Sequence, residues 1–116
     1  MQAIERRKNR SDIPSEAARL FLEAFAKRLK ARTMVLANED GLTVSGVGSS
    51  DELDAMAALA VIEPQKLSTL TRGDEPTYAL PMSIDGTRLV LASIGGDAPT
   101  TAEASAAVER LFFRAA

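Results

Sequence analysis

The chain has 116 residues, of which 46% are hydrophobic and 26% are charged, and its formal net charge is −2. This composition is ordinary for one globular domain and excludes a disordered chain. Because the sequence contains neither cysteine nor histidine, it excludes disulfides, Cys-based zinc sites and histidine acid–base catalysis.

The charges are unevenly distributed along the chain. Residues 1–32 hold nine Lys or Arg and four Asp or Glu, whereas residues 33–116 hold five and twelve. Residues 1–11 are basic and have no hydrophobic period, so we interpret them as a flexible N-terminal extension and residues 12–116 as a single domain. The alternative is a basic arm that contacts an acidic protein, anionic lipid or nucleic acid. We do not expect nucleic acid as a partner of this chain.

Membrane and targeting signals are not found in the sequence. No apolar run approaches the ~20 residues of a bilayer span, and the charged N-terminus lacks the hydrophobic segment of a signal peptide. We therefore predict no membrane span and a cytoplasmic location.

A first helix is predicted from about Asp12, because Asp12 can cap it and Pro14 suits a first helical turn. Its polar residues form one stripe, and the apolar remainder indicates that the helix lies on a sheet. Basic residues gather at its C-terminal end, where cations complement the helix dipole; a phosphate-binding patch is the alternative. These residues are Lys27, Arg28, Lys30 and Arg32.

Two strands, Thr33–Ala37 and Leu42–Gly46, are predicted to form a hairpin around the four residues 38–41, which end in glycine. The first strand is apolar on both faces, which indicates an interior strand, and the second is apolar on one face, which indicates a position nearer an edge. If the turn pairs Ala37 with Leu42, one face of the hairpin holds Val35, Ala37, Leu42 and Val44.

The segment SSDELDAMAALAVI, residues 49–62, predicts the helix around which the domain is organised. Ser49 and Glu52 have the spacing of a capping box, and Asp54 is the last polar residue before the helix ends. Such a helix should be buried on nearly all sides, which a chain of this length seldom achieves alone. We therefore predict that the same helix of a second copy packs on it across a two-fold axis. The predicted dimer interface consists of Leu53, Met56, Ala57, Ala58, Ala60 and Val61.

The glycine-containing loop Gly46–Ser50 precedes this helix and invites comparison with phosphate-binding loops. It has no GK[ST] ending, and Asp51 and Glu52 in the first helical turn would repel a phosphate. We interpret the loop as a flexible connection and predict neither a cofactor nor a metal site.

The segment after the middle helix is undecided between two structures. Pro64 bends or ends the helix, and Leu67 and Leu70 permit a short helical segment that finishes at Gly73. A short strand within residues 65–75 is the alternative.

A second hairpin has the strongest turn signal in the chain, because residues 77–84 and 87–94 flank Asp85–Gly86. Its register pairs Pro81 with Val90 in a non-hydrogen-bonded position, so the missing N–H of the proline faces outward and its strand is at an edge. One strongly apolar face of the hairpin is predicted to hold Tyr78, Leu80, Met82, Ile84, Leu89 and Leu91. The other, mildly apolar face holds Ala79, Pro81, Val90, Ala92 and Ile94.

A last helix is predicted from a capping box of Thr100 and Glu103 to about Arg114. Ala104 and Val108 begin an apolar period that continues through Leu111 and Phe112, so this helix also packs on the sheet.

The predicted order is α-β-β-α-(short element)-β-β-α, which gives an α+β fold with three α/β/α layers around a mainly antiparallel sheet of four or five strands. Three segments, MVLANEDGLTVSG, ELDAMAALAVI and IDGTRLVLASIGG, resemble the roadblock / dynein light chain family, which has a profilin-like fold. The likeness covers about residues 12–115. In that family the middle helix is the dimer helix and three strands usually follow it, whereas this sequence shows two.

The resemblance implies a non-enzymatic homodimeric interaction module, an adaptor or a regulator, with a small Ras-like GTPase or a larger scaffold protein as partner. The alternative is a small-ligand sensor of profilin-like or GAF-like type. No spacing assembles a nucleophile with a base, so we predict no enzyme and no catalytic residue. The candidate partner surface comprises Glu39, Asp40, Gly48 and Arg72, and Arg72 is the arginine we would mutate first, although nothing nominates it as an arginine finger.

Overall fold

The computed structural model describes residues 15–115, with side chains for residues 16–110. The predicted extension 1–11 and the start of the first helix lie outside the described residues. The elements in chain order are α2 (Ser15–Leu29), β1 (Thr33–Asn38), β2 (Thr43–Val47), α3 (Ser50–Ile62), the 3₁₀-helix η2 (Pro64–Leu70), β3 (Thr77–Ile84), β4 (Thr87–Ile94) and α4 (Thr101–Ala115). None of the helices in the described part is both long and apolar enough to cross a bilayer.

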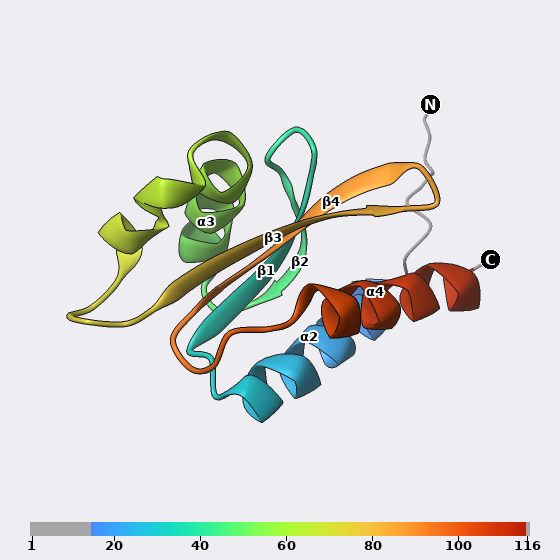
Figure 1. The fold of residues 1–116 in the computed structure, drawn as a ribbon, viewed down its shortest axis with the longest axis horizontal. Helices are drawn as coiled ribbons and strands as arrows, with labels where there is room; N and C mark the ends of the chain where they lie inside the picture. The colour runs from blue at the N-terminus through green and yellow to red at the C-terminus, as the bar shows by residue number, and fades with distance from the viewer. Residues whose placement is uncertain (1–14, 116) are drawn as a thin grey trace.

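The four strands form one antiparallel sheet in the order β2-β1-β4-β3. One face is covered by α3 and η2 and the other by α2 and α4 (Figure 1), which confirms the predicted three layers. β1 is interior and β2 is at an edge, as their apolar patterns predicted. The undecided segment after α3 is helical, and it ends at Leu70 rather than at Gly73.

Two hydrophobic cores lie on opposite faces of the sheet. The larger core packs α2 and α4 against residues such as Met34 and Leu91, and the smaller core packs α3 and η2 against residues such as Val35 and Ala92. These four strand residues are fully buried. The two central strands therefore contribute apolar side chains to both faces, which is why their sequences are nearly continuous hydrophobic runs.

The predicted register of the first hairpin is wrong. Ala37 pairs with Thr43 rather than with Leu42, and the register shifts between Leu36 and Ala37. This irregularity moves Val44 to the face of α2 and α4, where it packs against the larger core. Leu42 is left outside the pairing and is 62% exposed, because a bulge changes the alternation of side chains on the strand that carries it.

The predicted register of the second hairpin is confirmed. Ile84 pairs with Thr87, and Pro81 pairs with Val90. Positive φ angles of 52° at Asp85 and 82° at Gly86 are those of a two-residue type I′ turn, whose twist matches that of the flanking strands. β3 is the edge strand, as Pro81 indicated.

Candidate interaction surface

The inner face of α3 packs on the sheet of its own protomer. Leu53, Met56, Ala57 and Ala60 are buried there, and none is more than 8% exposed. These are four of the six residues of the predicted dimer interface. Their side chains therefore contribute to the core of the protomer, and the surface that α3 offers to another molecule is formed by its other residues.

The outer face of α3 is apolar over its second half. Asp51 and Asp54 are exposed near the N-terminus, but Ala58 and Val61 are half-buried and Ile62 is 70% exposed. Ile62 has the largest exposed fraction of the large hydrophobic side chains that the structure describes. Together with Ala55, this outer face presents small and apolar side chains to solvent.

The β1–β2 turn lies against the same helix. A Cβ built on Gly41 would be 3.3 Å from the Cα of Ala58, and Thr43 Oγ1 donates a hydrogen bond to Asp54 Oδ1 at 2.9 Å. Asp54, the last polar residue of the helix, is therefore used to hold α3 to the edge strand β2. Ala58 is partly covered by this turn, so its small size already serves the protomer.

The half-buried guanidinium of Arg32 connects the N-terminal end of α3 to the sheet. Arg32 Nε donates to Glu75 Oε2 at 2.7 Å, and Arg32 Nη1 donates to Glu52 Oε2 at 2.9 Å. Arg32 is 24% exposed, and both carboxylate side chains are 21% exposed. The sequence suggested that Arg32 complements the dipole of the first helix, with a phosphate-binding patch as the alternative. Its partners are 20 and 43 residues away, so no local signal could identify them.

The carboxyl of Glu75 has a lowered pKa, because the Arg32 side chain and then the backbone N–H of Arg72 donate hydrogen bonds to it. A carboxyl whose pKa is lower in the folded chain stabilises the fold above its unfolded value, and this contribution is lost as the pH falls through the folded pKa. We therefore expect Glu75→Gln to lower the melting temperature at pH 7. As the pH falls below the reference pKa of 4.5, the melting temperature of the variant should fall less steeply than that of the parent chain. Thermal melts from pH 7 to pH 3 measure both effects.

The matched control for this prediction is Glu109→Gln, an exposed position of α4 for which no ion pair is found among the described side chains. It should leave both the melting temperature and its pH dependence close to those of the parent chain. Equal pH profiles for the two variants would contradict the role given to Glu75.

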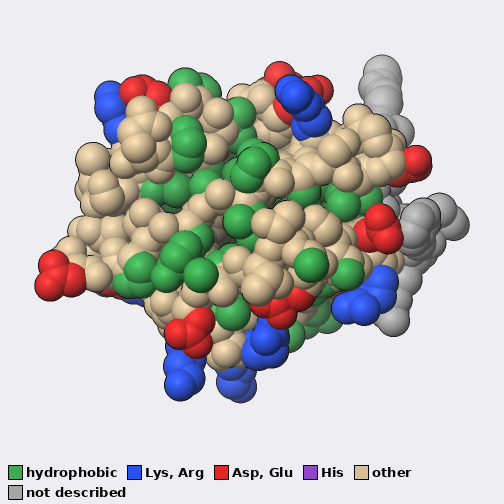
Figure 2. All heavy atoms as spheres, viewed as in Figure 1, with side chains coloured by type: hydrophobic (Ala, Val, Ile, Leu, Met, Phe, Trp, Pro, Cys, Tyr) green, Lys and Arg blue, Asp and Glu red, His purple; other side chains and the backbone are tan. Residues whose placement is uncertain are grey.

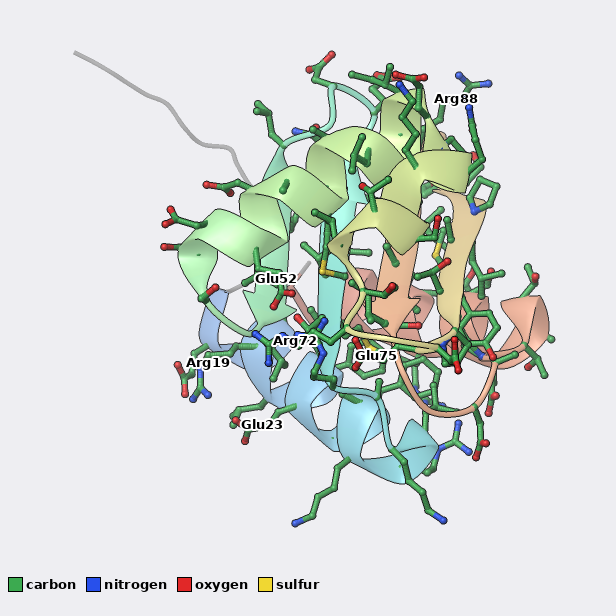
Figure 3. The ribbon with its side chains drawn as sticks, turned by 90° about the vertical axis from the view of Figure 1, so that its left-hand side faces the viewer. Arg19, Glu23, Glu52, Arg72, Glu75 and Arg88 are labelled. Carbon is green, nitrogen blue, oxygen red and sulfur yellow. The ribbon has the colours of Figure 1, made fainter. Side chains whose placement is uncertain are left out.

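The candidate partner residues do not form one surface. Glu39 and Asp40 lie in the β1–β2 turn, whereas Gly48 and Arg72 lie near the start of β1. The six residues of β1 separate the two groups by about 20 Å. Figure 3 shows Arg72 beside Glu52 and Glu75 at one end of the sheet, with Arg88 at the other end.

Gly48 has a structural explanation. Its φ angle is +143°, and a Cβ at this position would be 2.5 Å from Thr33 Oγ1. That hydroxyl donates a hydrogen bond to the carbonyl of Val47 at 2.7 Å. The glycine therefore allows a close approach between the end of β2 and the start of β1.

A hollow of about 460 Å³ adjoins the C-terminal end of α3. Val61 and Glu39 form one side, and Pro81, Arg88 and Val90 on the β3–β4 hairpin form another. Figure 2 shows hydrophobic side chains over the centre of the face that contains β3, with charged side chains around its margin. The hollow thus runs from Val61, at the C-terminal end of α3, onto the β3–β4 hairpin. The sequence did not reveal this surface.

Comparison with protein-family models and with curated proteins finds no significant match. Comparison with solved structures finds Myxococcus xanthus MglB, with a TM-score of 0.56 and 14% identity over 84% of this chain and 96% of that one. It also finds a Roadblock/LC7 domain from Streptomyces avermitilis, with a TM-score of 0.51 and 20% identity over 83% of this chain and 92% of that one. Element order, layers and these likenesses agree, and the chain has the fold of the Roadblock/LC7 domains.

Proposed function

We propose that the chain is a non-enzymatic homodimeric protein-interaction module of the roadblock family, which acts as an adaptor or a regulator. The observation that carries this proposal is the outer face of α3, which stays apolar after its inner face has been covered by the sheet. Covering about 400 Å² of such surface would contribute roughly 10 kcal/mol before the costs of association. A second copy of the chain carries an identical apolar face, so two copies can cover each other across a two-fold axis.

The shape of α3 suits a helix-to-helix contact across a two-fold axis. Ala55 presents little side-chain bulk in the middle of the helix, so two helix axes can approach to about 8–10 Å. Ile62 and Val61 supply larger apolar groups at the C-terminal end of the face. Pro81 in the middle of β3 removes one N–H donor from the outer edge, so the helix rather than the strand edge is the proposed contact.

We further propose a small Ras-like GTPase as the partner of the dimer. The support is the likeness to MglB and to a Roadblock/LC7 domain, joined to the acidic balance of residues 33–116. That balance favours a partner with a basic patch and an association rate that falls with salt. The acidic turn at Glu39 and Asp40 is the proposed contact, and a larger scaffold protein is the other partner class.

The test is calorimetric titration of the chain with a small Ras-like GTPase encoded near its gene, in the GDP-bound and GTP-bound states. We expect heat of binding in one nucleotide state and a changed rate of GTP hydrolysis. Arg72→Ala should leave the fold intact, because the Arg72 backbone rather than its side chain makes the hydrogen bond with Glu75. It should also leave binding unchanged, because Arg72 is about 20 Å from the proposed contact at Glu39 and Asp40. Lys27→Ala, which removes a positive charge from an exposed position of α2 on the other face of the sheet, is its matched control.

The outcomes separate the parts of the proposal. Absence of heat and of any effect on hydrolysis would remove the GTPase and leave the dimeric module to be tested by its oligomeric state. A loss of GTP hydrolysis with Arg72→Ala alone, at unchanged affinity, would give that side chain the role of an arginine finger.

A further inference from the structure

Helix α2 has more apolar surface than the sheet covers. Its sheet-facing stripe is buried and consists of Ala18, Leu22, Ala26 and Leu29. A second stripe follows with the spacing i, i+3, i+4, i+7 and faces α4; it consists of Phe21, Ala24, Phe25 and Arg28. Two apolar stripes on one helix are typical of a helix with neighbours on two sides.

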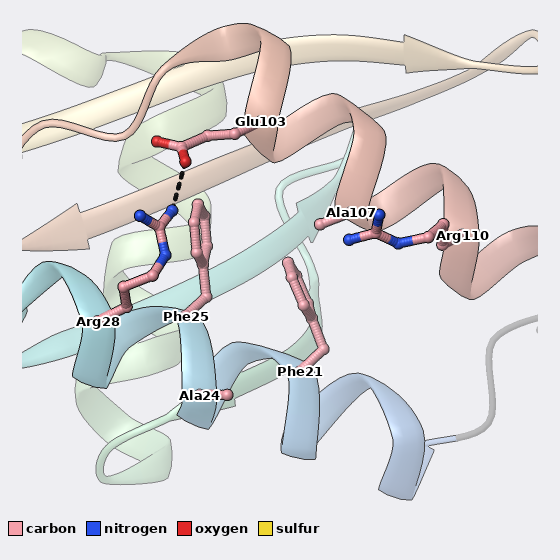
Figure 4. A pocket seen from close by; sticks show the side chains of 7 residues that line it. All are labelled: Phe21, Ala24, Phe25, Arg28, Glu103, Ala107 and Arg110. Carbon is pink, nitrogen blue, oxygen red and sulfur yellow. Dashed lines mark hydrogen bonds and ion pairs between the residues drawn. The ribbon is translucent and has the colours of Figure 1, made fainter.

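The second stripe lines a groove of about 400 Å³ between α2 and α4 (Figure 4). The rings of Phe21 and Phe25 stack in it, with centroids 5.4 Å apart and planes inclined by 21°. The facing helix contributes Glu103, Ala107 and Arg110, which follow the spacing i, i+4, i+7. Stripes with this spacing on two neighbouring helices are the pattern that a third helix requires if it packs there by knobs into holes.

Each end of the groove carries a guanidinium group (Figure 4). Arg28 stands over the Phe25 ring at 5.1 Å and forms an ion pair with Glu103. Arg110, at the Phe21 end, has no ion pair among the side chains that the structure describes. The three charged residues that line the groove therefore give it a net charge of +1. Arg28 lies beside Glu103, and Arg110 is seven residues further along α4. Seven helical residues span about 10 Å, which sets the spacing of the two arginine positions along the groove.

We propose that this groove binds an amphipathic helix of another protein, with apolar residues over Phe21 and Ala24 and carboxylates seven residues apart that reach Arg28 and Arg110. Phe25, which is 6% exposed and lies under the Arg28 guanidinium, forms the floor of the groove. The small side chains of Ala24 and Ala107 allow the backbone of that helix to approach closely. Arg28 retains donors beyond the one that it directs to Glu103, so it can share a second carboxylate. An acidic helix therefore matches the groove in spacing, apolar content and charge.

The groove lies on the face of the sheet opposite α3. The proposal is thus independent of the dimer, and a dimer through α3 would present two such grooves. The basic residues 1–11 of the chain itself have the wrong sign of charge for this rim, which argues for an occupant from another molecule.

The test uses the 116-residue chain and a synthetic helical peptide of about 18 residues, long enough to hold some helix in water. The peptide carries leucines at i, i+3, i+4 and i+7, glutamates seven residues apart at the edge of that stripe, and one tryptophan. Because the chain has no tryptophan, the fluorescence of the peptide reports binding directly. A second peptide replaces both glutamates by lysine.

We expect the glutamate peptide to bind one to one per protomer and the lysine peptide to bind about tenfold more weakly. Ala24→Gln, which places a longer neutral side chain in the groove, should weaken the glutamate peptide by about tenfold. Ala106→Gln is the matched control, because Ala106 is exposed on α4 but does not line the groove. Arg110→Glu should reverse the preference between the two peptides.

Several results would overturn the proposal. One is no binding of the glutamate peptide at millimolar concentration, and another is binding that Ala24→Gln leaves unchanged. A change of oligomeric state in Ala24→Gln would assign the groove to a second copy of the chain. Binding that appears only after deletion of residues 1–11 would assign it to the chain's own N-terminal segment.

Discussion

Replacing Gly96 by alanine is expected to lower the free energy of unfolding by about 3 kcal/mol or more, a large part of the stability of a small domain. The φ angle of Gly96 is +73°, and an added Cβ would lie 2.2 Å from the carbonyl oxygen of Leu29 and 2.5 Å from the carbonyl carbon of Lys30. Both contacts are with backbone, so a side-chain rotation cannot relieve them. The loop or the end of α2 would have to move.

The neighbouring contacts show what such a movement would disturb. The same Leu29 carbonyl accepts a hydrogen bond from Asp97 N–H at 2.8 Å, and Gly95 N–H donates to Pro76 O at 2.8 Å. The first bond holds the β4–α4 loop against the end of α2, and the second holds it against the segment before β3. Since the loop sets where α4 begins, the α2/α4 groove depends on the same close approach.

Urea unfolding followed by circular dichroism measures this effect as a shift in midpoint. The matched control is Gly86→Ala, because Gly86 also has a positive φ, +82°, but no described atom lies within 4 Å of its added Cβ. In the control, the free energy of unfolding should fall by only about 1–2 kcal/mol, the penalty for a residue with a Cβ in the left-handed conformation. Similar losses in the two variants would show that the close contact at Gly96 is relieved without cost.

Elements with a strong local signal could be predicted from the sequence. Asp85–Gly86 fixed a two-residue turn, and the register of the whole β3–β4 hairpin followed from it. The proline at position 81 indicated an edge strand for the same local reason, its missing N–H. The capping box predicted for the last helix is confirmed by its two reciprocal hydrogen bonds, Thr100 N–H to Glu103 Oε1 and Glu103 N–H to Thr100 Oγ1, each 3.2 Å long, because a cap involves only residues close in sequence. In α3 only the N-cap bond from Glu52 N–H to Ser49 Oγ is found, since the Glu52 carboxylate accepts from Arg32 instead.

Features that depend on distant contacts could not be predicted. The longer turn at residues 38–41 permits more than one pairing register of β1 with β2. The register shifts between Leu36 and Ala37, and neither residue type indicates such a shift. The partners of Arg32 come from α3 and from the loop before β3. The groove between α2 and α4 arises only when the two helices are placed on the sheet.

The candidate dimer interface on α3 was also predicted only in part from the sequence. Composition indicated that α3 needs cover on more than one side, but the mean apolar character of the helix could not indicate which side faces its own sheet. The structure assigns Met56 and Ala57 to the inner side and leaves Ile62 exposed. A dimer test must therefore change the outer side, where a substitution does not enter the core of the protomer.

Ile62→Glu is accordingly expected to convert the dimer into a monomer at micromolar concentration. Ile62 is 70% exposed, so a carboxylate at this position remains in water when the protomer is alone. In a two-fold contact through α3, each of the two new carboxylates would be desolvated without a partner. The cost is several kcal/mol per buried charge, and the symmetry applies it twice.

The matched control for this prediction is Leu20→Glu, which introduces the same charge at a leucine that is 50% exposed on α2, across the sheet from α3. Size-exclusion chromatography with light scattering gives the mass of each variant, and circular dichroism checks that the protomer remains folded. We expect a dimer for the parent chain and for Leu20→Glu, and a folded monomer for Ile62→Glu. A monomeric parent chain would contradict the dimer itself, and a dimeric Ile62→Glu would contradict the α3 contact. Because each variant adds charge on only one face of the sheet, a monomeric Leu20→Glu would place the dimer contact on the layer formed by α2 and α4.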